Sequence, residues 1–142
     1  MVFAPETAPR EREAFLQWYM QQTEWGEAHS YDDPAVSTPE LRAWFQDMVL
    51  EFPPLNGPHA SSDLDDPRLT DYSVACGVIY AAFPWSEAEA AREAVVRLAR
   101  QHGVGFFDAS SEEAAIVYPN DQASSVNPAA EPAGKKPWWK LW

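Results

Sequence analysis

The stretch of sequence that decides the fold is YSVACGVIYAAFPWSEAEAAREAVVRLARQHGVGFF, residues 72–107. Its first part, residues 72–83, is rich in β-branched and aromatic side chains, which favour strands. It is also longer than an average strand. The run therefore predicts either two strands that turn near Gly77 or one long strand that is bulged there.

A helix is predicted to follow, because Ser86 and Glu89 have the spacing of a capping box and Gly103 is a typical helix stop. Residues 104–107 then predict another strand. The apolar positions of the helix recur at a helical period and predict its buried stripe: Ala91, Ala94, Val95, Leu98 and Ala99.

Two further helices are predicted upstream. The first opens near Thr7, with Pro9 in its first turn. The second opens at Ser37 or Thr38, with Glu40 placed to close a capping box on Ser37. The second helix has the clearer amphipathic stripe: Leu41, Trp44, Phe45, Met48, Val49 and Phe52. We expect one shared core that contains Trp44, Phe45, Met48, Ile79, Val95, Leu98 and Phe106.

Short strands at residues 2–4 and 115–118 complete the order β-α-α-β(β)-α-β-β. This order predicts an α+β fold, a two-layer sandwich with a mixed, mostly antiparallel sheet and the helices on one face. We expect one domain over residues 1–118, a flexible linker over residues 119–134, and a basic aromatic tail over residues 135–142.

Charge is divided unevenly along the chain. All three lysines lie in the last eight residues, whereas the first 134 residues carry 22 acids against 7 arginines, a net charge of −15. A surface of this charge disfavours nucleic acid, whose phosphates it repels, and suits a cationic protein partner. The alternative is that the acidic residues only keep the protein soluble.

Two loops concentrate the acids, and we assign partner-binding residues there: Asp32, Asp33, Asp63, Asp65 and Asp66. With His29 and His59, the same aspartates allow an alternative, a small metal-dependent enzyme, because oxygen and imidazole ligands bind divalent cations. Their spacing matches no calcium-binding loop, and such residues are also ordinary turn formers. The sequence therefore assigns no metal ligand.

No motif for nucleophilic catalysis is present, and no catalytic residue or cofactor is assigned. Cys76 is the single cysteine, and its apolar surroundings in the sequence predict a buried, inert thiol. No apolar run is long enough to span a membrane, and the N-terminus shows no signal peptide. These features favour the cytoplasm and leave the oligomeric state open.

The tail KKPWWKLW combines cations with indoles, and we expect it to dock on another surface. A membrane interface, the acidic body of the same chain, and a groove on another protein are all compatible with its chemistry. A passive, unattached end is the remaining alternative. The docking residues would be Lys135, Lys136, Trp138, Trp139, Lys140 and Trp142.

Several segments, among them HSYDDP (29–34), VIYAAFPWS (78–86), HGVGFFD (102–108) and the KPWWK-type C-terminus, resemble a family of small uncharacterised bacterial proteins. Some members of that family lie near polymorphic-toxin genes. The resemblance implies an immunity-like role, namely binding and neutralising a basic toxin. It implies no catalytic residues.

Overall fold

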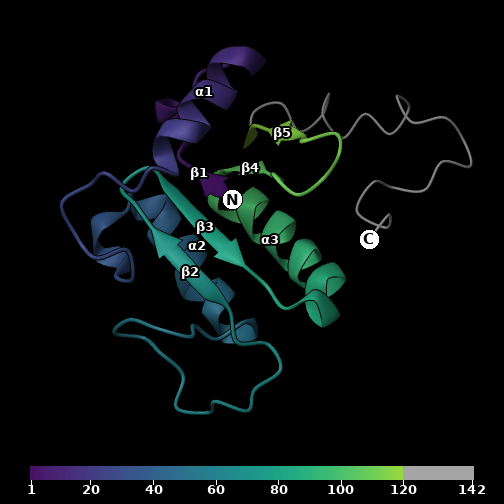
Figure 1. The fold of residues 1–142 in the computed structure, drawn as a ribbon. Coiled ribbons are helices and arrows are strands. Elements are labelled where there is room, and N and C mark those ends of the chain that lie inside the picture. The colour runs from purple at the N-terminus through teal and green to yellow at the C-terminus, as the bar shows by residue number, and fades with distance from the viewer. Residues whose placement is uncertain (120–142) are drawn as a thin grey trace, which may run out of the picture.

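The computed structural model describes residues 1–119 and shows an α+β fold (Figure 1). Three helices are present in the described part: α1 (Arg12–Gln22), α2 (Pro39–Glu51) and α3 (Ala88–His102). The strands are β1 (Val2–Phe3), β2 (Asp71–Val74), β3 (Val78–Ala82), β4 (Gly105–Phe107) and β5 (Ile116–Val117). They form one sheet in the order β2-β3-β1-β4-β5, in which every neighbouring pair is antiparallel. The predicted order of elements is confirmed.

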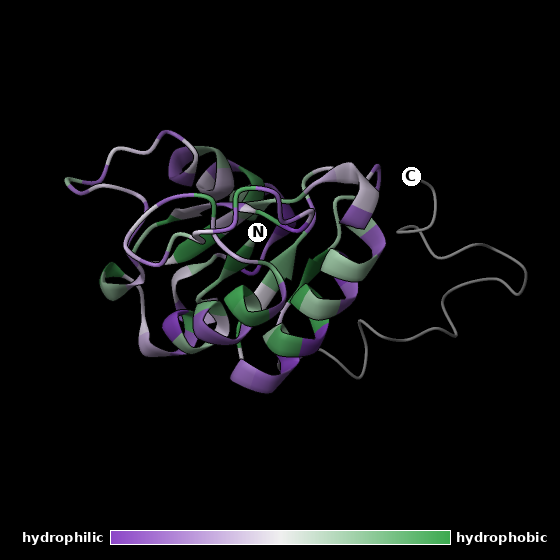
Figure 2. Cartoon of the chain, turned by 90° about the horizontal axis from the view of Figure 1, so that it is seen from below, coloured by the Kyte–Doolittle hydropathy of each residue, from purple (hydrophilic) through white to green (hydrophobic). Residues whose placement is uncertain are grey.

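The two faces of the sheet are covered by different helices. Adjacent residues point to opposite faces, so Val2 packs in one apolar cluster with α2 and α3, whereas Phe3 packs in another with α1. The prediction that all helices share one face is therefore wrong for α1 (Figures 1 and 2). The physical reason is that β1, β3 and β4 have apolar residues at consecutive positions, which is typical of strands buried on both faces.

The predicted core is confirmed. Trp44, Met48 and Ile79 are essentially inaccessible, and the remaining four predicted members lie in the same cluster between the sheet and the pair α2–α3. Figure 2 shows the consequence for the helices, whose hydrophobic sides face inward and whose hydrophilic sides face outward. Helical periodicity was therefore a sufficient guide to this face of the sheet.

Two of the three helix starts differ from the capping predictions. Glu11, not Thr7, caps α1, and its carboxylate accepts hydrogen bonds from the next turn. Thr38, one of the two caps predicted for the second helix, caps α2. At α3 the predicted capping box is absent, because Ser86 lies in a short 3-10 turn, Trp85–Glu87, before the helix begins. Two other 3-10 turns cover Pro5–Thr7 and Pro34–Val36.

The run at residues 72–83 forms two strands that turn at Cys76 and Gly77, which is one of the two predicted alternatives. The Ala75 N–H donates to the Val78 carbonyl at 2.9 Å and closes this turn. Before β2, a long connection extends beyond the rest of the fold, at the bottom of Figure 1. Within residues 1–119, no helix has both the length and the hydrophobicity needed to cross a membrane.

Candidate functional site

β3 extends beyond its neighbour β1, which begins beside the first residue of the chain. β1 contributes Val2 opposite Ile79 and Phe3 opposite Val78, but β3 continues to Ala82. On its other edge β3 pairs with β2 from Ile79 to Ala82. Within the described residues, Ala81 and Ala82 therefore have a strand neighbour on one side only, although they lie in the interior of the sheet.

The phase of the ladder shows which backbone groups face this gap. In an antiparallel pair, the groups of successive residues point alternately to the two neighbouring strands. The Gly77 carbonyl accepts from the Ala4 N–H on the β1 side, at 2.9 Å, so the groups of Ile79 and Ala81 point the same way. The N–H and C=O of Ala81 are thus directed into this gap.

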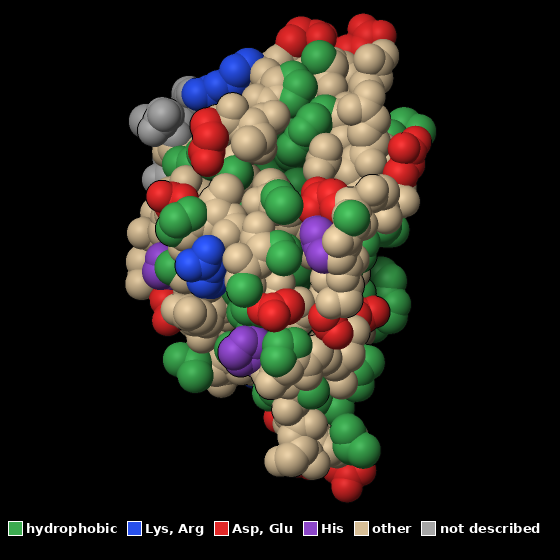
Figure 3. Space-filling view, turned by 90° about the vertical axis from the view of Figure 1, so that its left-hand side faces the viewer, with side chains coloured by type: hydrophobic (Ala, Val, Ile, Leu, Met, Phe, Trp, Pro, Cys, Tyr) green, Lys and Arg blue, Asp and Glu red, His purple; other side chains and the backbone are tan. Residues whose placement is uncertain are grey.

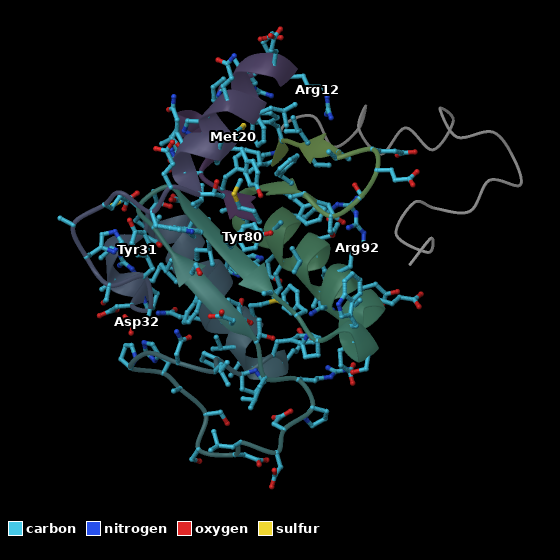
Figure 4. All side chains as sticks on the ribbon, viewed as in Figure 1. Arg12, Met20, Tyr31, Asp32, Tyr80 and Arg92 are labelled. Carbon is cyan, nitrogen blue, oxygen red and sulfur yellow. The ribbon has the colours of Figure 1, made fainter. Side chains whose placement is uncertain are left out.

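A cavity of about 340 Å³ lies beside the gap, between β3, α3 and the end of β4. Its lining is mainly apolar and includes Trp44, Val95 and Phe106 beneath the sheet. Trp85 stands at its edge and is 76% exposed, which is unusual for a tryptophan in a folded domain. Figure 4 shows Tyr80 and Arg92 on the two sides of this region, one on β3 and the other on α3.

The polar end of the cavity is a buried ion pair. The Arg92 guanidinium donates to the Asp108 carboxylate, and both side chains are only 8% exposed. Asp108 also accepts from the N–H and hydroxyl of Ser110, at 3.0 and 2.7 Å. Burial lowers the pKa of Arg92 to about 10 although Asp108 opposes the shift, so the guanidinium is still charged at neutral pH. The cavity therefore offers an apolar floor and one fixed ion pair.

A second constellation joins Glu27, His29 and Cys76. Their ligand atoms lie within 4.8 Å of one another, and this is the one group of three or more such side chains that residues 1–119 bring together. Glu27 is central, because its Oε1 lies 2.5 Å from His29 Nε2 and accepts the backbone N–H of Cys76 at 3.0 Å. Cys76 is exposed at the hairpin turn, which contradicts the predicted buried thiol.

These contacts shift all three pKa values. The hydrogen bond to Glu27 raises the pKa of His29. The same carboxylate raises the pKa of the Cys76 thiol. Partial burial works against the charged form of Glu27, but the hydrogen bonds from His29 and Cys76 outweigh it and lower its pKa. A thiol with a raised pKa is a poor nucleophile, so the cluster is not an activated cysteine site.

The predicted partner-binding aspartates lie on the loops, away from the cavity. Asp63 and Asp65 are exposed, whereas Asp32, Asp33 and Asp66 are half-buried. Four of the five accept hydrogen bonds that shape local turns: Asp32, Asp33, Asp63 and Asp66. The two loops meet where the backbone of Asp32 passes Gly57, whose φ of +87° suits glycine. Figure 3 shows acidic side chains at several separate places on one face of the molecule.

The alternative metal site is not assembled as the sequence suggested. His29 joins Glu27 and Cys76 rather than the aspartates, and His59 packs against Phe45 with ring centroids 5.9 Å apart. The tail residues Lys135, Lys136, Trp138, Trp139, Lys140 and Trp142, with most of the predicted linker, lie outside the described residues.

Sequence reasoning did not identify the gap, the Arg92–Asp108 pair or the Glu27–Cys76 contact. Arg92 interrupts the apolar face of its helix, which was a usable signal for a buried partner. No protein-family model, no curated protein and no solved structure matches the chain. The functional assignment therefore rests on the geometry and chemistry of residues 1–119.

Proposed function

We propose that this protein is a protein-binding module whose cavity between β3, α3 and the end of β4 receives apolar side chains of a basic partner. The observation that carries this proposal is an apolar cavity on an acidic molecule, with the exposed Trp85 at its edge. Tryptophan is enriched in protein interfaces, where a few aromatic and apolar contacts in well-packed pockets contribute most of the binding energy.

The rim of the cavity supplies the first part of the recognition. Trp85 stands there and is 76% exposed, so a partner that covers this indole removes a large apolar surface from water.

The cavity supplies the second part. An apolar side chain of the partner would enter the cavity and lie on the apolar surface of Trp44, Val95 and Phe106. A leucine-sized side chain buried there contributes about 1.5–3 kcal/mol relative to an exposed one. The Arg92–Asp108 pair marks the polar end and limits how far an apolar residue can extend.

Charge supplies the third part. The chain has a net charge of −12, so its field attracts a cationic partner and accelerates encounter. The aspartates of the two loops, Asp32, Asp33, Asp63, Asp65 and Asp66, belong to this steering surface. A basic toxin is the partner that the family resemblance suggests, and its neutralisation would then be an immunity function.

A synthetic peptide in which leucine alternates with lysine tests the proposal on the full chain. We expect labelled peptide to bind, with affinity falling as salt rises. Replacing the leucines of the peptide with serine should abolish binding, because the cavity then receives no apolar side chain. Ala81→Phe should also abolish it by filling the cavity, whereas Ala60→Phe, at an exposed loop position, should leave it unchanged.

Equal binding of the leucine and serine peptides would contradict the proposal, as would an absence of binding by the leucine peptide. The basic aromatic tail has the same chemistry as the peptide and is the competing occupant. If the peptide binds only after Trp138→Ser and Trp139→Ser, the tail fills the cavity and the assignment to a partner protein is wrong.

A further inference from the structure

The hydrogen bonds of His29 orient its ring as in a metal-binding histidine. Nδ1 lies 2.8 Å from the Ser30 carbonyl oxygen, and Nε2 lies 2.5 Å from Glu27 Oε1. Both partners are acceptors, so Nδ1–H donates to the carbonyl and Nε2 shares a proton with the carboxylate. A histidine whose Nδ1 donates to a backbone carbonyl is the usual arrangement around a metal bound at Nε2.

The backbone holds the cluster in place from both sides. Cys76 lies at a two-residue turn whose carbonyl groups accept from the start of α2: Ser37 Oγ donates to Ala75 at 2.7 Å and the Thr38 N–H donates to Cys76 at 3.2 Å. On the loop side, the Val74 N–H donates to the Tyr31 carbonyl at 2.8 Å.

The loop also folds around one aromatic side chain. The Tyr31 hydroxyl bonds to the backbone of Glu27, and its ring packs against His29 with centroids 4.5 Å apart. Tyr31 and Asp32 are labelled in Figure 4 on this loop, well away from Arg92. The three side chains are thus positioned before any ligand arrives.

We infer that Glu27, His29 and Cys76 form a zinc site, in which a carboxylate oxygen, Nε2 and Sγ are the three protein ligands. Zinc accepts this mixture of oxygen, nitrogen and sulfur ligands, and three protein ligands leave a fourth position for water. The exposure of Cys76 places that fourth position toward solvent. This site is separate from the cavity beside β3 and does not depend on the proposed function.

The distances are close to those that zinc requires. Zinc lies about 2.0–2.3 Å from such ligands, so two ligand atoms of one ion are about 3–4 Å apart. The Glu27–His29 separation of 2.5 Å must widen, and the largest separation of 4.8 Å must shorten. Side-chain rotation is sufficient for both, because Glu27 and His29 are only half-buried and Cys76 is exposed.

Zinc binding releases two protons and leaves the net charge of the cluster unchanged. Zinc replaces the proton shared between Nε2 and the carboxylate and the proton of the Cys76 thiol, and both protons pass to solvent. The metal-free cluster holds an imidazolium, a carboxylate and a neutral thiol, which sum to zero. A zinc ion with neutral imidazole, carboxylate and thiolate also sums to zero, so binding buries no uncompensated charge.

Two measurements on the full chain test this inference. They are the absorption spectrum with bound Co²⁺ and the rate of alkylation of Cys76, the single cysteine. We expect Co²⁺ to produce a thiolate-to-metal charge-transfer band in the near ultraviolet, which stoichiometric Zn²⁺ removes. Zinc should also slow alkylation of Cys76. Glu27→Gln and His29→Gln should each weaken zinc protection about tenfold or more, since even changes to the groups that hydrogen-bond metal ligands cost about 10–100-fold in affinity.

His59→Gln is the matched control, because His59 lies outside the cluster, and it should leave both readouts unchanged. Circular dichroism of each variant separates loss of a ligand from loss of the fold. The inference is wrong if cobalt gives no thiolate band. It is also wrong if folded Glu27 and His29 variants keep the same zinc protection as the wild type, since Cys76 would then bind the ion alone.

Discussion

Replacing Gly105 with alanine tests the packing at the centre of the sheet. Gly105 of β4 lies opposite Phe3 of β1, and a Cβ at this position would lie 2.2 Å from Phe3 Cζ. An ordinary contact needs at least 3.4 Å, so the ring must retreat by about 1.2 Å. Phe3 is fully buried, and its ring is enclosed by Phe15 and Tyr118, with centroids 5.1 and 5.3 Å away.

The magnitude follows from two opposing effects. Overpacking of a closed site costs about 1–3 kcal/mol, and the enclosure of Phe3 places this case near the upper end. Glycine inside a strand is itself about 0.5–1 kcal/mol worse than alanine, which offsets part of that cost. We therefore expect Gly105→Ala to lower the free energy of unfolding by about 2 kcal/mol. For a domain of this size, that is a fall in Tm of about 8 °C.

Thermal and urea unfolding monitored by circular dichroism measure the change. Gly26→Ala is the control, because nothing lies within 4 Å of its added Cβ. Combining Gly105→Ala with Phe3→Leu should recover part of the loss, so the double variant should be more stable than the sum of the single effects allows. If Gly105→Ala unfolds at the wild-type temperature, or if the two substitutions are strictly additive, the proposed contact is wrong.

Three further substitutions test other parts of the structure. Leu98→Ala should lower stability by about 2–5 kcal/mol, because Leu98 lies in the core between α3 and the sheet; an unchanged melt would contradict that packing. Arg92→Met should cost about 3–5 kcal/mol by leaving Asp108 buried without its partner, and adding Asp108→Leu should restore part of the loss in a double-mutant cycle. Replacing Asp63, Asp65 and Asp66 together with Asn should change stability little, because these side chains lie on an outlying loop, but should slow association with a cationic peptide and weaken its salt dependence.

Local patterns were sufficient for most of the fold. The stripe from Leu41 to Phe52 and the periodicity around Val95 and Leu98 predicted two helices and the core they share. These signals work because a helix that packs on a sheet must carry one apolar face. The side of the sheet that α1 covers was not predictable in this way, since Phe3 and Val2 are both apolar and neither face is marked as the outer one.

Both candidate sites depend on contacts between distant parts of the chain. Cys76 and Glu27 are 49 residues apart, and Arg92 and Asp108 are 16 apart, so no spacing rule connects them. Cys76 was predicted to be buried because its neighbours are apolar. The hairpin turn reverses the chain there and exposes the thiol, while the apolar neighbours enter the sheet.

The indole N–H signal of Trp85 in an amide NMR spectrum tests the central claim most directly. Trp85 stands at the edge of the cavity, whereas Trp18 packs against Phe3 on the opposite face of the sheet and serves as an internal reference. On addition of the alternating leucine–lysine peptide to the full chain, we predict that the Trp85 signal shifts while that of Trp18 stays as it was. A peptide that binds but leaves the Trp85 signal unchanged would contradict the account, because the peptide would then bind outside the cavity.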